Sequence, residues 1–180
     1  MIVYIFNLKF RGMELKDNSA DKVITALRIA RLSLFSALSV VGSFIHPPSP
    51  IQTVAFDSAP GFFAALYFGA FDGALICGIG HLCTSIVNGF PLGVLHFPIA
   101  LGMAMVGAIM GLLNRPKKGL SLILAVIAGI ILNTSLFVIA VPSLGWAAAL
   151  AFVPFLLLAA SLNAFVSAIV YVGIRRGTQG

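Results

Sequence analysis

The chain has 180 residues, of which 60% are hydrophobic and 9% are charged, and its mean hydropathy is +1.09. Soluble domains are about half apolar, so this composition excludes an ordinary soluble catalytic domain and indicates an integral membrane protein. The formal net charge of +6 does not point to a nucleic-acid partner, because the basic residues stand in short clusters between apolar runs, as cytoplasmic anchors of membrane helices do.

Residues 1–23 precede the first long apolar run, and we expect them to form a cytoplasmic N-terminal segment. The first residues, MIVYIFNL, are too few to span a bilayer, and the charged stretch KFRGMELKDNSADK follows them. A cleaved signal peptide carries its charge before its apolar region, so this order argues against one. Met13 is a second candidate start.

Six apolar runs follow and predict an all-α membrane protein. A spanning helix needs about 20 apolar residues, so the chain has room for about five or six crossings. In chain order the runs are Ile24 to Ile45, Ala59 to Phe71, Gly73 to Val87, Gly93 to Leu113, Leu120 to Val141 and Ala147 to Gly173. We expect residues 24–176 to form one membrane domain.

The second and third runs could be one helix or two, because only Asp72 and Gly73 interrupt them. Lysine and arginine tend to stay in the cytoplasm. If the two runs form two helices, all eleven Lys and Arg residues lie on the cytoplasmic side. If they form one helix, one basic cluster lies on the outer side. The eleven are Lys9, Arg11, Lys16, Lys22, Arg28, Arg31, Arg115, Lys117, Lys118, Arg175 and Arg176. We therefore predict six transmembrane helices with both termini cytoplasmic.

The two short helices would each be only about 20 Å long at 1.5 Å per residue. Both cannot be straight, lipid-facing helices of full depth, so we expect them to line an aqueous cavity or to lengthen into their loops. The predicted outer segments are His46 to Ser58, Asn88 to Leu92 and Pro142 to Trp146, and none of them contains Lys or Arg.

Asp57 is the one acidic residue in these outer segments. One interpretation is a helix cap, in which Asp57 or Ser58 accepts hydrogen bonds from free backbone N–H groups while Pro60 occupies the first turn. The other is a ligand contact, shared with Gln52 and Thr53 of the same loop. The two roles are compatible, and both stay open.

Two histidines lie in or beside apolar helices. His81 shares one helical stripe with Thr84, Ser85 and Asn88. A polar stripe in a membrane faces protein or a cavity, so His81 either makes an interhelical hydrogen bond or lines a pocket. His96 starts the fourth helix at the depth of Asp57, where it either packs at an interface or contacts a ligand.

Other polar groups carry weaker signals. Asp57, His81 and His96 have no metal-site spacing, and Cys77 and Cys83 are not a metal-type pair, so we predict no metal. Asn133 and Asn163 stand alone in apolar helices and are expected to hydrogen-bond between helices, with pocket contact as the alternative.

Aromatic residues gather in the predicted outer half and would suit a flat heterocyclic ligand, although each alone is also typical of a lipid-facing belt. They are Phe56, Phe62, Phe63, Tyr67, Phe90, Phe97 and Trp146. The predicted ligand contacts are Gln52, Asp57, Phe63, Tyr67, His81, Asn88, His96 and Trp146.

Catalytic motifs are weak. No G-x-S-x-G sequence frames a serine and no phosphate-binding loop is present, so we predict neither an enzyme nor a bound cofactor. Uphill transport would need an energised partner or ion coupling.

Three stretches resemble a known family: SLFSALSVVGSFI, VAFDSAPGFFAALYFGAFDGALICGIGHL and NGFPLG. With the six-helix pattern they are similar to the substrate-binding S components of energy-coupling factor (ECF) vitamin transporters, from about Ile24 to Arg176. The resemblance implies a multi-pass protein of the bacterial plasma membrane that binds a vitamin or vitamin precursor at its outer face. It also implies two kinds of partner, a transmembrane T component and two cytoplasmic ATPases.

Family members dock to the T component through an A-x-x-x-A motif on the first helix. ALRIA supplies Ala26 and Ala30, whereas SLFSA supplies Ser33 and Ala37, with serine in place of the first alanine. Both registers place small residues four apart, which permits close helix approach, and ordinary internal packing is the alternative.

The ligand class follows from absences in the sequence. Nickel and cobalt relatives carry a histidine directly after the initiator methionine, and this chain has none there. Without outer Lys or Arg, folate-like or biotin-like carboxylates lack a partner, so we expect a neutral or cationic nitrogen heterocycle. Thiamine-like or pyrimidine-like compounds and α-ribazole-like compounds rank equally, ahead of flavins. The rival functions are an ion-coupled carrier and an intramembrane enzyme.

Overall fold

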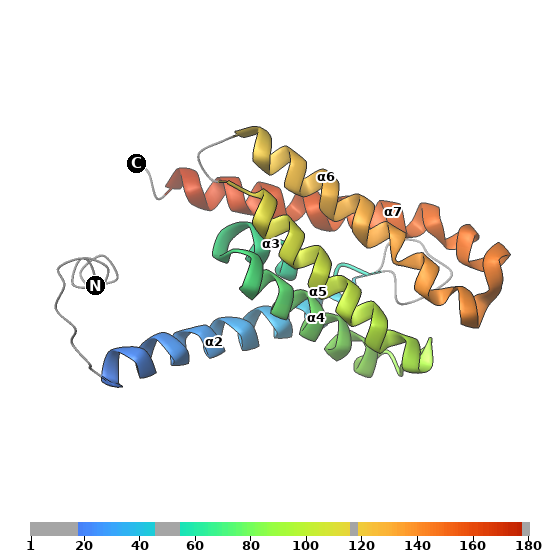
Figure 1. Ribbon diagram of the computed structural model, residues 1–180, viewed down its shortest axis with the longest axis horizontal. Coiled ribbons are helices and arrows are strands. Elements are labelled where there is room, and N and C mark those ends of the chain that lie inside the picture. Colours follow the sequence, from blue (N-terminus) through green and yellow to red (C-terminus); the bar gives the residue numbers. More distant parts are fainter. Residues whose placement is uncertain (1–17, 46–54, 116–118, 178–180) are drawn as a thin grey trace. The chain divides into compact units, whose positions relative to one another are not determined.

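The computed structural model describes residues 18–45, 55–115 and 119–177, and all regular elements in these ranges are helices (Figure 1). They are α2 (Asn18–Gly42), α3 (Ala59–Phe68), α4 (Ala70–Val87), the 3-10 helix η1 (Gly93–Leu95), α5 (His96–Leu113), α6 (Gly119–Ser135) and α7 (Phe137–Gly177). The chain divides after Arg31 into two compact units, and the features below belong to residues 32–180.

The helices have the length and exterior of a multi-pass membrane protein. Four are long and apolar enough to cross a bilayer, namely Lys22–Gly42, Ala70–Val87, Gly93–Leu113 and Phe137–Gly177, and Ala59–Phe68 and Leu120–Ser135 are shorter apolar helices. Large aliphatic side chains stand outward, with Leu112 68% and Ile169 71% exposed. Such an apolar exterior suits lipid rather than water. Six crossings and cytoplasmic termini stay predictions.

The structure separates the second and third apolar runs, as predicted, but at a different residue. The break is at Gly69, whose φ of 101° suits only glycine, and not at Asp72 and Gly73, which lie inside α4. Asp72 occupies the first turn of α4, where a carboxylate is favourable beside the helix dipole. The expectation that Asp72 and Gly73 end a helix was therefore wrong.

Small residues hold α3, α4 and α5 close together. A Cβ added at Gly61 would lie 2.5 Å from Cys77 Sγ, and one added at Gly73 would lie 2.5 Å from Ala65. Gly61 precedes Ala65 on α3, whereas its partner Cys77 follows Gly73 on α4, so these two helices are antiparallel. The same pattern along α4 and α5, which pack side by side in Figure 1, makes that pair antiparallel as well.

The helix directions place the described residues Arg115, Arg175 and Arg176 at one end of the bundle. Ala59 contacts Asn163 and Tyr67 contacts Tyr171, so α3 and α7 are parallel. Because α5 also runs in the direction of α3, the end of α5 at Arg115 and the end of α7 at Arg175 and Arg176 point the same way. This arrangement agrees with the predicted common cytoplasmic side for these three arginines.

The last two predicted runs are divided differently in the structure. α6 ends at Ser135, and α7 continues from Phe137 through the predicted outer segment Pro142 to Trp146. The helical geometry fails only at Gly145, whose φ is 75° and ψ is 162°, so α7 consists of a short arm and a long arm. The predicted outer loop is therefore a kink within a helix.

Candidate functional site

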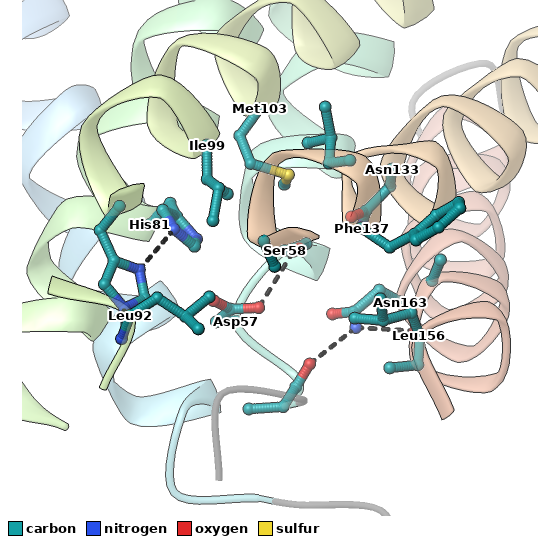
Figure 2. Close-up of a pocket in the computed structure, with 16 residues that line it drawn as sticks. Asp57, Ser58, His81, Leu92, Ile99, Met103, Asn133, Phe137, Leu156 and Asn163 are labelled. Carbon is teal, nitrogen blue, oxygen red and sulfur yellow. Dashed lines mark hydrogen bonds between the residues drawn. The ribbon is translucent and has the colours of Figure 1, made fainter. Parts of the chain in front are cut away.

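A cavity of about 100 Å³ lies among the helices of the second unit (Figure 2). A water molecule needs roughly 10–15 Å³ of such space, so the cavity has room for several waters or a small organic molecule. Its polar lining residues are Asp57, Ser58, His81, His96, Asn133 and Asn163. Its apolar lining residues are Ala55, Leu92, Ile99, Met103, Leu136, Phe137, Ala140, Leu156, Ala159 and Ala160.

The cavity lies at the end of the bundle opposite Arg115, Arg175 and Arg176. Asp57 and Ser58 come just before α3, and His96 is the first residue of α5, whose far end leads to Arg115. Asn133 is near the end of α6, which is antiparallel to α5 because Gly129 meets Met110 and Leu136 meets Gly102. With these arginines on the predicted cytoplasmic side, the cavity belongs to the predicted outer half of the protein.

Asp57 is half-buried and lies between the two sides of the cavity. Figure 2 shows Asp57 and Ser58 between His81 and Asn163. The Ser58 hydroxyl donates to Asp57 Oδ1 at 3.0 Å. Burial raises the pKa of the Asp57 carboxyl to about 6, and hydrogen bonds from the Ser58 side chain and from nearby backbone N–H groups partly oppose this effect.

The predicted cap of α3 comes from another helix. Ser58 is the N-cap residue but its side chain makes no capping hydrogen bond, whereas Asn163 Oδ1 on α7 accepts from the Ala59 N–H at 2.7 Å. Pro60 does occupy the first turn, as expected. The Ser58 hydroxyl is committed to Asp57 instead, so the capping interpretation is wrong for Ser58. The Asp57 carboxyl does accept from backbone N–H groups, those of Asp57 and Ser58.

The two histidines face each other on the α4–α5 side of the cavity. His81 Nε2 lies 3.2 Å from His96 Nδ1, and the ring centroids are 5.3 Å apart. Ser85 Oγ donates to the His81 carbonyl at 2.7 Å and lies 2.9 Å from His96 Nδ1. His96 is 1% exposed, so its ring is held within this network.

The backbone of Leu92 fixes the tautomer of both rings. The Leu92 N–H donates to His96 Nε2 at 3.2 Å, so that nitrogen carries a lone pair and the His96 proton sits on Nδ1. This Nδ1–H points to Ser85 Oγ and His81 Nε2, which must both accept. A neutral His81 then carries its proton on Nδ1, where it can donate to a ligand.

One of three comparisons with known proteins gives a match. A family model described as ECF transporter, substrate-specific component, matches residues 27–174. The chain belongs to this family. No curated protein and no solved structure gave a significant match. The protein is thus the substrate-specific component of an ECF transporter. Components of this family are membrane subunits that in general partner with a T component and ATPases, and the family is not an enzyme family.

The structure brings together three of the predicted ligand contacts of this S component, namely Asp57, His81 and His96. Gln52 lies outside the described residues. The remaining four do not line the cavity: Phe63, Tyr67, Asn88 and Trp146.

Each of these four has other surroundings. Phe63 stacks on Phe35 at 5.5 Å between centroids and on Tyr67 at 5.4 Å, within an aromatic cluster of the core. Asn88 donates to the Thr84 carbonyl one turn earlier. Trp146, 61% exposed, follows the kink of α7. Their ligand contacts stay predictions without support from the cavity.

Asn133 and Asn163 line the cavity, although the sequence favoured interhelical bonding for both. Asn163 does both: it hydrogen-bonds to the backbone before α3 and also borders the cavity. The apolar lining residues, such as Met103, Phe137 and Leu156, were not predicted. In an apolar helix such residues look the same whether they face a cavity, the core or lipid.

Two further predictions concern metal and docking. The described residues hold no cluster of three His, Cys, Asp or Glu side chains suited to a metal ion. On α2, all four predicted docking residues are exposed: Ala26, Ala30, Ser33 and Ala37. Ala26 and Ala30 belong to the first unit, and Ser33 and Ala37 belong to the second. Each pair is four residues apart, so its two small side chains lie on one face of the helix, and docking through them stays a prediction.

Proposed function

We propose that this S component captures a vitamin or vitamin precursor of the neutral or cationic nitrogen-heterocycle type at the outer face of the membrane, for ATP-driven import. One observation carries the ligand class: among the described residues that line the cavity, Asp57 is the one carboxylate, and none is Lys or Arg. A positively charged group on the ligand would pair with Asp57 in a largely apolar site.

The same lining disfavours an anionic ligand. A carboxylate such as that of biotin would lose its hydration on entering the cavity and would find no cationic side chain there. It would also lie near the Asp57 carboxylate, and burying an unpaired charge costs free energy. Histidine adds a complementary feature, because the Nδ1–H of His81 offers a donor to a ring nitrogen, carbonyl or hydroxyl oxygen. The preferred ligand therefore carries a cationic or donor group toward Asp57 and an acceptor toward His81.

Thiamine-like or pyrimidine-like compounds and α-ribazole-like compounds fit this description equally, and flavins rank next. All carry flat nitrogen rings, and the cavity offers Phe137 together with aliphatic side chains for apolar contact. After this S component has captured the ligand, ATP hydrolysis by the two ATPases of the T component assembly would drive release of the ligand into the cytoplasm.

The first experiment identifies the ligand. The full-length protein is purified in a mild detergent, and mass spectrometry is applied to any small molecule that it retains. Titration calorimetry then tests thiamine, its hydroxymethylpyrimidine precursor, α-ribazole, riboflavin and biotin. We expect a nitrogen heterocycle without a carboxylate to bind most tightly. Retention of biotin, or of another carboxylate, would contradict the proposal.

The second experiment tests the mode of transport. Uptake of the ligand so identified is measured in proteoliposomes that contain this protein alone or together with a T component and two ATPases. We expect uptake only in the full assembly and only with ATP. Uptake by the protein alone, driven by an ion gradient, would instead make it an ion-coupled carrier.

The third experiment tests docking through α2. We expect S33L and A37L to reduce co-purification with the T component about fivefold or more, because a leucine side chain keeps the partner helix at a distance. Ligand affinity should stay within about twofold, since neither residue lines the cavity. L38A, which shortens an exposed side chain about 100° or more around α2 from Ser33 and Ala37, is the matched control.

A further inference from the structure

Asn163 makes an unusually complete set of hydrogen bonds for a side chain inside an apolar helix. Its Nδ2 donates to the Ala55 carbonyl at 3.0 Å and to the Ala159 carbonyl at 2.8 Å, while its Oδ1 accepts from the Ala59 N–H at 2.7 Å. The side chain is 1% exposed. Both amide protons are thus used, and the side chain has no donor left for a ligand.

The two long-range bonds stand symmetrically around Asp57. Ala55 is two residues before Asp57 and Ala59 is two residues after it, so one amide group holds both ends of the five-residue segment 55–59. Figure 2 shows Asn163 on the opposite side of Asp57 from His81, with a dashed line to the backbone of this segment. The cavity wall that carries the carboxylate is therefore tied to α7 through this side chain.

We infer that Asn163 is a positioning residue that fixes where the Asp57 carboxylate stands in the cavity. The expected effect of Asn163 on ligand binding rests on the proposed function. The effect on the surroundings of Asp57 does not, because it can be measured without a ligand. Asn163 acts through the backbone of its neighbours. Its replacement should alter the surroundings of Asp57 even though no direct hydrogen bond joins the two side chains.

Ser167 offers a matched control one turn along α7. Its Oγ lies 2.8 Å from the Ala59 carbonyl oxygen and 2.6 Å from the Asn163 carbonyl oxygen, and its one proton is shared between these two acceptors, so it also connects α7 to α3. It is as buried as Asn163 but does not line the cavity. S167A therefore removes a hydrogen bond between the same two helices without releasing Ala55 or the Ala59 N–H.

The first test follows the ionisation of Asp57 in the ligand-free, full-length protein by NMR of aspartate labelled with ¹³C at the carboxyl carbon, with D57N to assign the signal. His81 and His96 are the other titratable groups that line the cavity, and their ring signals are recorded in parallel. In the wild type we expect a midpoint near the raised pKa of about 6. In N163A the freed segment should admit water, and the midpoint should fall toward 3.8, by about one pH unit or more.

In S167A the midpoint should stay within about 0.3 pH units of the wild type, because the segment around Asp57 keeps both ties. An unchanged midpoint in N163A, or an equal change in S167A, would overturn the inference. If N163A does not fold, N163S takes its place, since a serine hydroxyl there would bond within its own helix, as Ser167 does, and still release the segment.

The second test is a double-mutant cycle with thiamine and with α-ribazole as probes. N163A should weaken binding by about tenfold or more in the wild-type background, and by less than about threefold in the D57N background, because its effect passes through Asp57. Equal losses in both backgrounds would overturn the inference. If neither probe binds the wild type while the NMR shift appears, the proposed ligand class fails and the positioning role of Asn163 stands.

Discussion

The two sides of the cavity are built in opposite ways. On the α4–α5 side, His81, Ser85 and His96 bond to one another and to the backbone of Leu92, all within sixteen residues of sequence. On the α7 side, Asn163 bonds to backbone groups 104 and 108 residues away. The histidine side is thus a local network, which forms when the neighbouring helices α4 and α5 pack together. The carboxylate side exists only when α3 and α7 are packed together.

The difference also separates the roles of the two sides. The histidine network satisfies most of its own donors and acceptors and leaves one N–H, on His81, for a ligand. Asp57 supplies the charged group of the cavity. Its present hydrogen-bond partners leave lone pairs of the carboxylate oxygens free to accept from a ligand. We therefore expect charge on the ligand to be recognised by the Asp57 side and hydrogen-bonding pattern by the histidine side.

The largest expected effect is on the carboxylate side. D57N keeps the shape of the side chain and an acceptor for Ser58 but removes the charge, so the affinity for thiamine, which is permanently cationic, should fall by about 10- to 100-fold. Titration calorimetry measures the change. S58A is the control and should cost much less. Equal, negligible effects of D57N and S58A would remove Asp57 from the ligand site.

The pH dependence of binding should have a defined sign. Asp57 is charged only above its raised pKa of about 6, so thiamine affinity of the wild type should rise as the pH increases through that value and then level off. D57N should lose this rise. The contribution to folding has the opposite sign: protonation is easier in the folded state, so the stability it adds is present below about 3.8 and is lost as the pH rises through about 6.

A smaller effect is expected on the histidine side. H96A removes the group that holds the His81 tautomer, so probe affinity should fall by about five- to tenfold while the preference for cationic over neutral probes is retained. The ¹⁵N shifts of His81 should report Nδ1 protonation in the wild type and a mixture of tautomers in H96A. C83A, on α4 outside the cavity, is the control. A His81 protonated on Nε2 in the wild type would contradict the assignment.

S85A should have a still smaller effect. Without the Ser85 hydroxyl, the His96 Nδ1–H still has His81 Nε2 as its acceptor at 3.2 Å, so the tautomers should persist and affinity should change by about threefold or less. A loss as large as that in H96A would show that Ser85, rather than His81, is the partner that holds His96.

The smallest effect is expected for the aromatic residues that the sequence placed in the site. Tyr67 is 41% exposed and Trp146 is 61% exposed, and neither borders the cavity. Y67L and W146L should therefore leave probe affinity within about twofold, while F137L, which changes a lining residue, should reduce it more. A strong loss in W146L would place the ligand beyond the cavity described above.

The sequence by itself determined the membrane class, the existence of the apolar helices and the three titratable residues that meet at the cavity. The physical reason is local: a long apolar run must become a helix in lipid, and a charged or imidazole side chain within such a protein must face its interior. Asp57, His81 and His96 could be found in this way because each is a polar exception in an apolar setting.

Only the tertiary structure decided where the helices end and which groups contact or hydrogen-bond to the residues of the site. The break between α3 and α4 fell at Gly69, which takes a positive φ, whereas Gly73 stayed helical because it packs closely against Ala65 of α3. The Ala59 N–H found its acceptor on α7, and Phe63 and Tyr67 stacked on each other rather than toward the cavity. A hydrogen bond over 104 residues depends on how helices pack, which no local pattern encodes.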